Sequence, residues 1–250
     1  MEKSYYKKYY HLERGHWWFK ARGEILMNHL DTVFQGRTDL KILNVGVATG
    51  HTSELLSRFG QVTSVEYDID CFNFVKENLK IDIVNASILD LPFEENQFDL
   101  VCAFDVIEHV KEDSEAVEEM RRVCKKGGIL SVTVPAFMFL WSEHDVVNHH
   151  FRRYTAKILR GLFEKEDEPI FHSYFNFWLF FPIAFFRLLM NFIKGNKKIT
   201  PEEAQSDFEN FNNGVVNTIF YHIFKSENLF LKNKVRFPLG VSLLSTWRKK

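Results

Sequence analysis

Histidines and carboxylates gather in two short stretches of the chain, and these side chains can move protons or hold a metal ion. One stretch reads "HDVVNHHFRR" and begins at residue 144. An imidazole titrates near neutral pH and can accept a proton from a substrate hydroxyl, while a neighbouring carboxylate can orient the ring. An arginine beside them can hold a substrate anion. A solvated polar loop is the alternative. The candidate catalytic residues are His144, Asp145, His150 and Arg153.

The other stretch, "DVIEH", spaces Asp105, Glu108 and His109 at i, i+3 and i+4. In a helix these positions share one face, and two carboxylates with an imidazole are ligands for a divalent cation. A histidine from 144–150 can complete the set. Such a cation would lower the pKa of a bound hydroxyl and orient it. The alternative is that Glu108 and His109 only cap, pair and pack.

A glycine turn, "LNVGVATGHT" at 43–52, is the third feature with a chemical meaning. A dinucleotide fingerprint needs glycines where this chain has Ala48 and His51, and a P-loop needs a lysine that "GHT" lacks. Gly46 and Gly50 supply a tight turn. Glu66 follows Gly46 by 20 residues, the distance at which an acid holds ribose hydroxyls. The pattern favours an adenosine ligand without a pyrophosphate, such as S-adenosyl-L-methionine.

These residues need a scaffold that brings the ends of several strands together. Strand and helix patterns alternate from about residue 40 to 136, which is typical of a doubly wound parallel sheet with right-handed crossovers. Ligands of such sheets bind at the carboxyl ends of the strands. The glycine turn lies at that edge, and Asp105 stands where the fourth predicted strand ends. Before the first strand, the apolar spacing predicts a helix over 17–34.

The order of these fragments resembles the class I S-adenosylmethionine-dependent methyltransferases over nearly the whole chain. "LNVGVATG" and "VEYD" are similar to the first two motifs of that family, and "RRVCKKGGILSVTVPA" is similar to a later one. The fragments "HWWFKAR", "WSEHDVVNHHFRRYT" and "FPLGVSLL" resemble a subgroup of the family. The chain departs from the family pattern at Asn44, usually aspartate, at Ala48, usually glycine, and at Ser87, where an acid often contacts the adenine.

The resemblance implies an α/β fold: a doubly wound, seven-stranded, mostly parallel Rossmann-like sheet with a helical N-terminal cover and a C-terminal helical insert. It implies S-adenosyl-L-methionine as cofactor. Around the methionine moiety it places Gly46, Ala48, Gly50 and Phe104. Glu66 would take the ribose, and the adenine would meet Tyr67, Ser87 and Ile88.

Four segments are expected: a helical cover at 1–38, the cofactor-binding core at 39–175, an aromatic helical insert at 176–233, and the final core strand at 234–250. The insert contains "FWLFFPIAFF", which is too short to span a bilayer. We expect it to fold as a lid over the pocket. A homodimer interface and a peripheral membrane contact are the alternatives.

The composition excludes some classes of partner. The 32 basic and 33 acidic residues give a net charge of -1, so no nucleic-acid partner is expected. Three widely spaced cysteines predict neither a disulfide framework nor a metal site made of cysteines. With a charged, aromatic N-terminal stretch that does not look like a secretory signal, these features favour a cytoplasmic protein.

The expected function is methyl transfer from S-adenosyl-L-methionine, with O-methylation of a small-molecule or glycan-type acceptor as its form. An NAD-dependent oxidoreductase is one alternative, and the missing glycines argue against it. A non-catalytic cofactor-binding module is the other, and the histidine- and arginine-rich stretch argues against that.

Overall fold

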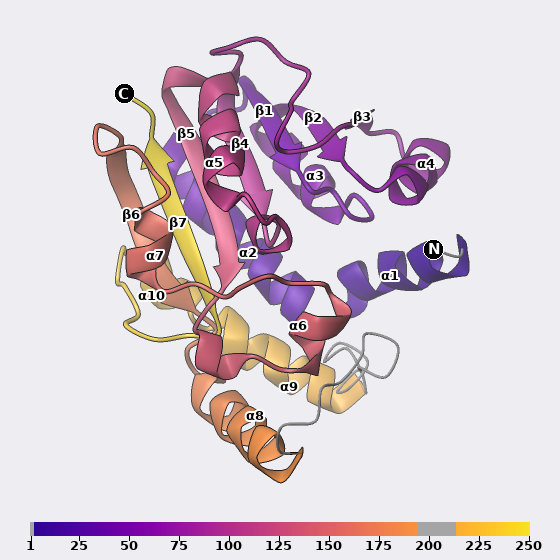
Figure 1. The fold of residues 1–250 in the computed structure, drawn as a ribbon, viewed down its shortest axis with the longest axis vertical. Helices are drawn as coiled ribbons and strands as arrows, with labels where there is room; N and C mark the ends of the chain where they lie inside the picture. Colours follow the sequence, from indigo (N-terminus) through magenta and orange to yellow (C-terminus); the bar gives the residue numbers. More distant parts are fainter. Residues whose placement is uncertain (1–2, 195–213) are drawn as a thin grey trace.

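The computed structural model describes residues 3–194 and 214–250. Within these residues, seven strands form one sheet in the order β3-β2-β1-β4-β5-β7-β6 (Figure 1). The strands are β1 (Leu40–Val45), β2 (Gly60–Glu66), β3 (Asp82–Asn85), β4 (Phe98–Phe104), β5 (Cys124–Pro135), β6 (Glu168–Phe175) and β7 (Ser242–Arg248). β1 to β5 are parallel, and β7 runs antiparallel to both β5 and β6. This arrangement confirms the predicted fold class.

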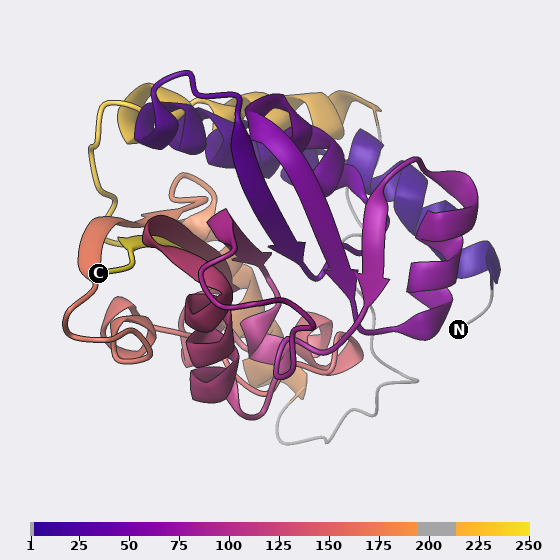
Figure 2. The same ribbon diagram turned by 90° about the horizontal axis from the view of Figure 1, so that it is seen from above.

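Helices cover both faces of the sheet (Figure 2). The longer ones are α1 (Lys3–Gly15), α2 (Trp17–Phe34), α4 (Ile69–Asn78), α5 (Asp113–Val123), α8 (Phe180–Lys194) and α9 (Gly214–Lys225). The shorter ones are α3 (His51–Leu56), α6 (Glu143–Val147), α7 (Ala156–Arg160), α10 (Asn228–Leu231) and the 3₁₀ turns η1 (Ser57–Phe59), η2 (Ile107–His109) and η3 (Met138–Leu140).

Alternation along the strands divides the buried side chains into two cores. Successive strand residues point to opposite faces, so Leu43 packs toward α5 and Ile42 packs toward α2. On the second face, α9 adds Phe224 to the core that α2 forms with the sheet. The sheet is therefore buried on both sides.

The carboxyl ends of β1 to β5 lie at one edge, and α1, α6, α8 and α9 lie beyond it at the bottom of Figure 1. In the predicted insert, α9 packs along α2, and α8 packs on the loop that follows β5. Residues 195–213 of the insert lie outside the described residues. The expected division into cover, core, lid and final strand stays a prediction. No helix among the described residues has the length and apolarity to cross a bilayer.

Candidate active site

The turn after β1 has a left-handed backbone at three positions. The φ angles are 75° at Gly46, 49° at Ala48 and 87° at Gly50. A Cβ atom on Gly46 would lie 2.3 Å from Cγ2 of Val106, so no larger residue fits without moving the segment after β4. Ala48 carries a methyl group in the left-handed region, where a non-glycine residue costs roughly 1–2 kcal/mol. The turn is therefore tight, and its backbone conformation at Ala48 lowers the stability of the protein.

Glu66 ends β2 directly beside this turn. Its two carboxylate oxygens accept the backbone N–H groups of Ala48, at 3.1 Å, and of Asp68, at 3.0 Å. Burial raises the pKa of Glu66, and these hydrogen bonds oppose the shift. Each oxygen keeps further acceptor capacity, because an ionised carboxylate offers about four lone-pair sites. Glu66 is thus held in place by the protein and can still accept two ribose hydroxyls. Tyr67, the next residue, is 78% exposed.

The remaining predicted cofactor residues lie where β3 and β4 end. The Oγ atom of Ser87 accepts the N–H of Leu89 at 3.1 Å, and the side chain of Ile88 is buried. Phe104 is buried at the end of β4, with the guanidinium of Arg22 5.8 Å from its ring centroid. These contacts place all three residues at the cofactor edge, and their individual roles stay predictions.

Helix α1 crosses the glycine turn, held by contacts that the sequence analysis missed. Glu13, which is buried, accepts a hydrogen bond from the hydroxyl of Thr49. Tyr6 donates to Asp68 at 2.8 Å at the start of α4. Burial raises the pKa of Glu13 to about 7, although Thr49 and Arg14 oppose the shift. Nothing in the local pattern marks Glu13, because its partner lies 36 residues away.

Asp105 turns away from the site that the sequence predicted for it. Its φ is 58°, and its carboxylate forms an ion pair with Arg22 at 2.5 Å. The following residues form the 3₁₀ turn η2 in place of an α-helix. The expectation that Asp105, Glu108 and His109 share one helical face is therefore wrong, because the backbone reverses at Asp105 and Arg22 of α2 holds its side chain.

Glu108, His109 and His150 form a cluster whose ligand atoms all lie within 4.8 Å of one another. The loop that carries His150 reaches η2 because the N–H of Phe151 donates to the carbonyl of Glu108 at 2.8 Å. The rings of His109 and His150 meet edge to face, with centroids 4.5 Å apart. Burial lowers the pKa of His109 to about 4, assisted by His150. We call these three residues the Glu-His cluster.

Glu108 is unusual in this cluster, because its side chain is completely buried and neither carboxylate oxygen has a hydrogen-bond partner. Burial raises its pKa well above the usual range, and the nearby charge of Asp105 adds to the shift. An unpaired buried carboxylate is costly unless a proton or a cation neutralises it. The site thus calls for a positive charge that the described residues do not supply through a hydrogen bond.

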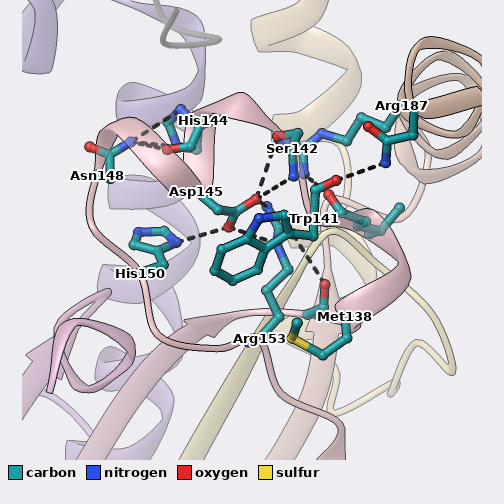
Figure 3. A network of polar contacts seen from close by, with 12 residues as sticks. Met138, Trp141, Ser142, His144, Asp145, Asn148, His150, Arg153 and Arg187 are labelled. Carbon is teal, nitrogen blue, oxygen red and sulfur yellow. Dashed lines mark hydrogen bonds and ion pairs between the residues drawn. The ribbon is translucent and has the colours of Figure 1, made fainter. Parts of the chain in front are cut away.

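Asp145 is the centre of a fully paired network beside the cluster (Figure 3). It accepts Nε and Nη2 of Arg153 at 2.8 and 2.9 Å, Nδ1 of His150 at 2.9 Å, and the N–H of Ser142 at 2.8 Å. Burial alone would raise the pKa of Asp145, but the hydrogen bond from His150 and the charge of Arg153 outweigh it and hold the pKa well below the usual range. Asp145 therefore stays ionised.

The network separates the predicted catalytic residues into two groups. His150, Asp145 and Arg153 lie together, whereas His144 faces Asn148, with its Nδ1 3.3 Å from the amide nitrogen. Arg153 is buried against Asp145, so the geometry makes it a support for that carboxylate. Because an ionised Asp145 can only accept, His150 donates from Nδ1 and presents the lone pair of Nε2 to a proton or a metal.

A cavity of about 400 Å³ lies elsewhere, near the C-terminal end of α2, and is lined in part by Phe34, Gly127 and Arg248. None of the predicted site residues lines it. The predicted site residues and this cavity are therefore separate.

Comparisons with known proteins bear on the family and the fold. Residues 43–132 match the model of a methyltransferase domain family. The chain is 28% identical over 172 residues to a probable S-adenosylmethionine-dependent methyltransferase of Mycolicibacterium smegmatis, covering 65% of each protein. It is 27% identical over 158 residues to a demethylmenaquinone methyltransferase of Staphylococcus aureus, covering 56% of this chain and 63% of that protein. The chain thus spans less than two thirds of the length of these relatives.

Among solved structures, a putative sarcosine dimethylglycine methyltransferase from Galdieria sulphuraria aligns with a TM-score of 0.57 and 14% identity, over 90% of this chain and 84% of that one. A putative methyltransferase in complex with the Haloferax volcanii Trm112 activator aligns with a TM-score of 0.59 and 12% identity, over 98% and 94% of the two chains. At these identities the likeness shows the fold alone.

Proposed function

We propose that the chain, whose residues 43–132 match a methyltransferase domain family, transfers the methyl group of S-adenosyl-L-methionine to a hydroxyl oxygen of a small-molecule or glycan-type acceptor. The observation that carries the proposal is the Asp145–His150 pair at the carboxyl edge. A carboxylate that fixes an imidazole in one tautomer makes a positioned proton acceptor. Methyl transfer to a hydroxyl requires such an acceptor, because the oxygen must lose its proton.

The residues around the glycine turn fit the cofactor. Glu66 is anchored by two backbone N–H groups and retains acceptor capacity for two ribose hydroxyls. The left-handed turn needs glycine at Gly46 and Gly50, because a Cβ atom there would collide with Val106 and with Leu79, respectively. When bound, S-adenosyl-L-methionine supplies an activated methyl group on its sulfonium. The protein's own task is then to align the acceptor oxygen and to take its proton.

His150 and Asp145 perform that task in the proposal. Asp145 is kept ionised by Arg153 and holds Nδ1 of His150. The acceptor O–H gives its proton to the imidazole as the oxygen bonds to the methyl group. The imidazolium that results is stabilised by the Asp145 carboxylate. Arg153 acts through Asp145 and is a positioning residue.

We further propose that the Glu-His cluster holds a divalent cation. The buried carboxylate of Glu108 has no hydrogen-bond partner, and His109 and His150 offer ring nitrogens within 4.8 Å of it. A carboxylate and two imidazoles suit Zn²⁺, Mn²⁺ or Fe²⁺. With a cation bound, Nε2 of His150 would be a ligand and could not also accept the proton; the cation would then lower the pKa of the acceptor hydroxyl, and the proton would leave to water. Asp105, which the sequence suggested as a further ligand, is paired with Arg22.

The function is tested by incubating the protein with radiolabelled S-adenosyl-L-methionine and three acceptor sets: catechols, diol-bearing glycans, and quinols with an open ring carbon. We expect labelled methyl on oxygen. Label on carbon alone would replace O-methylation with C-methylation, the reaction that the name of a Shewanella sediminis relative states. Thermal stabilisation by NAD and not by S-adenosyl-L-methionine would favour an oxidoreductase. Cofactor binding without turnover on any acceptor would favour a non-catalytic module.

The cation is tested separately. Protein purified without chelator or metal-affinity resin is analysed for metal content, beside Glu108→Gln and the control Asp39→Asn, whose carboxylate is exposed. We expect bound metal in the wild type and the control, its loss in Glu108→Gln, and reduced activity in EDTA. Full activity in EDTA with no bound metal would leave His150 as a plain general base.

A further inference from the structure

Helix α8 is apolar on the side that faces away from the protein. Its inner stripe, Phe180, Ala184 and Arg187, is buried, with Phe180 and Ala184 packed on Leu140 of η3. The outer residues are also apolar, with 70% of Phe185 and 86% of Phe192 exposed. A helix that is hydrophobic all round is normally covered by another apolar medium. We call the exposed side chains the aromatic face: Trp178, Phe181, Phe185, Phe186, Leu189, Phe192, Ile193, Leu229 and Phe230.

The aromatic face is fixed to the rest of the molecule. The buried carboxylate of Glu227 accepts the backbone N–H groups of Asn176 and Phe177 at 2.7 Å and of Trp178 at 3.1 Å, just before α8 begins. The ring of Trp178 then contacts that of Phe230 in α10, with centroids 6.0 Å apart. This contact joins the segment just before α8 to α10, so the aromatic face includes residues of both helices.

The charges at this surface have one sign. The sequence contains no aspartate or glutamate between Glu168 and Glu202. Among the described residues after Glu168, the single acidic side chain is Glu227, which is buried. Lys232, Lys234 and Arg236 follow Phe230 and are exposed. Among the described residues after Glu168, the exposed side-chain charges are thus basic, and an aromatic surface accompanied by basic residues complements a negatively charged apolar medium.

We propose that the aromatic face docks the protein on the surface of an anionic lipid bilayer. The aromatic side chains enter the boundary between headgroups and acyl chains, and the basic residues lie among the anionic headgroups. Since no helix among the described residues can cross a bilayer, the contact is confined to one leaflet. Tryptophan and phenylalanine on the apolar side and lysine or arginine on the polar side are the features of such a surface.

Docking through α8 would also bring the carboxyl edge of the sheet close to the membrane. Nη1 of Arg187 donates to the carbonyl of Leu140 at 2.8 Å, and the Asn191 amide donates to the carbonyl of Trp141 at 3.0 Å. Trp141 immediately precedes Ser142, which caps the helix that carries Asp145 (Figure 3). The same segment thus supports the outer helix and the polar network of the site.

The proposal is tested by cosedimentation with two kinds of vesicle: phosphatidylcholine alone, and an equal mixture of phosphatidylcholine and phosphatidylglycerol. We expect binding to the mixed vesicles to be at least about tenfold stronger, because each basic residue near an anionic surface adds attraction. Added salt should weaken it. Equal binding to both vesicles, or binding to neither, would overturn the proposal.

Three variants locate the contact. Phe185→Ser with Phe192→Ser should abolish vesicle binding, and Lys232→Gln with Lys234→Gln and Arg236→Gln should remove the preference for anionic lipid. Ile158→Ser removes an exposed apolar side chain on α7 and is the matched control, which should bind like the wild type. Circular dichroism confirms that each variant is folded. A dimer in solution that the phenylalanine variant dissociates, without vesicle binding, would make a second copy the occupant and overturn the lipid proposal.

Discussion

Glu66 and Glu108 are both withdrawn from solvent at the same edge of the sheet, yet their surroundings differ completely. Glu66 accepts two backbone N–H groups, whereas neither oxygen of the fully buried Glu108 has a hydrogen-bond partner. A carboxylate that is already anchored can receive neutral hydroxyls without rearrangement. One without partners is neutralised by a proton or by a cation. The difference teaches that the protein alone satisfies the carboxylate of Glu66 through hydrogen bonds and leaves that of Glu108 without one.

Asp145 extends this comparison, because it is as buried as Glu108 but has every partner it needs. Asp145→Ala should destabilise the protein by about 3–5 kcal/mol, since it removes the carboxylate that balances the charge of the buried Arg153. Urea denaturation measures the change. Asp39→Ala, which removes an exposed partner of Arg37, is the control and should change stability little. If Asp145→Ala lost as little stability as the control, the network around Asp145 would not stabilise the folded protein.

Glu13 provides a test of the contact between α1 and the glycine turn. Its pKa is raised from 4.5 to about 7, so between these values the folded protein binds more protons than the unfolded chain. Its contribution therefore lowers stability as pH rises from about 4.5 to 7, by roughly 3 kcal/mol in total. Relative to the wild type, Glu13→Gln should gain stability across this window. Thermal denaturation over pH measures the difference, and parallel pH profiles would show that Glu13 is not buried between α1 and the glycine turn.

Glu66→Ala tests the proposed contact between Glu66 and the ribose of the cofactor. It removes charged hydrogen bonds to the ribose and should weaken the binding of S-adenosyl-L-methionine by roughly 1.5–3 kcal/mol, or about 10- to 150-fold. Calorimetric titration measures the affinity, with the exposed Glu94→Ala as control. Unchanged affinity in Glu66→Ala would remove Glu66 from the cofactor site.

Glu108→Gln should have the smallest effect on stability. The amide has nearly the same shape and carries no charge, so the metal-free variant should differ from the metal-free wild type by less than about 1 kcal/mol. Asp145→Ala, by contrast, is expected to cause a large loss of stability, although both side chains are buried. Chemical denaturation in EDTA compares the stability of Glu108→Gln with that of the wild type. A large loss in Glu108→Gln would mean that the protein itself already balances the Glu108 carboxylate.

The features that the sequence predicted correctly depend on local patterns. Alternation of strands and helices is a local periodicity, so the fold class could be read directly. The left-handed turn at Gly46 and Gly50 likewise follows from residue type, because glycine adopts this conformation at little cost. Glu66 lies beside the turn, as its spacing indicated, because its distance from the turn is set by one helix and one strand; its contact with the ribose stays a prediction.

The features that the sequence missed depend on contacts between distant segments. Asp105 was assigned to a helix face with Glu108, but Arg22 of α2 holds it elsewhere. Arg153 was assigned to the substrate, but the chain turns back after α6 at His149, where φ is 55°, and brings Arg153 onto Asp145. Spacing rules for a helix do not apply where the backbone reverses, so neither pairing could be predicted locally.

The most direct test of the account is a crystal structure of the wild-type protein with S-adenosyl-L-homocysteine and Mn²⁺, using the anomalous signal of the metal. The account predicts ribose hydroxyls on the carboxylate of Glu66 and an anomalous peak between Glu108, His109 and His150. A cofactor bound away from Glu66 would contradict the proposed contact between Glu66 and the ribose. A Glu-His cluster without metal at saturating Mn²⁺ would contradict the proposed cation site.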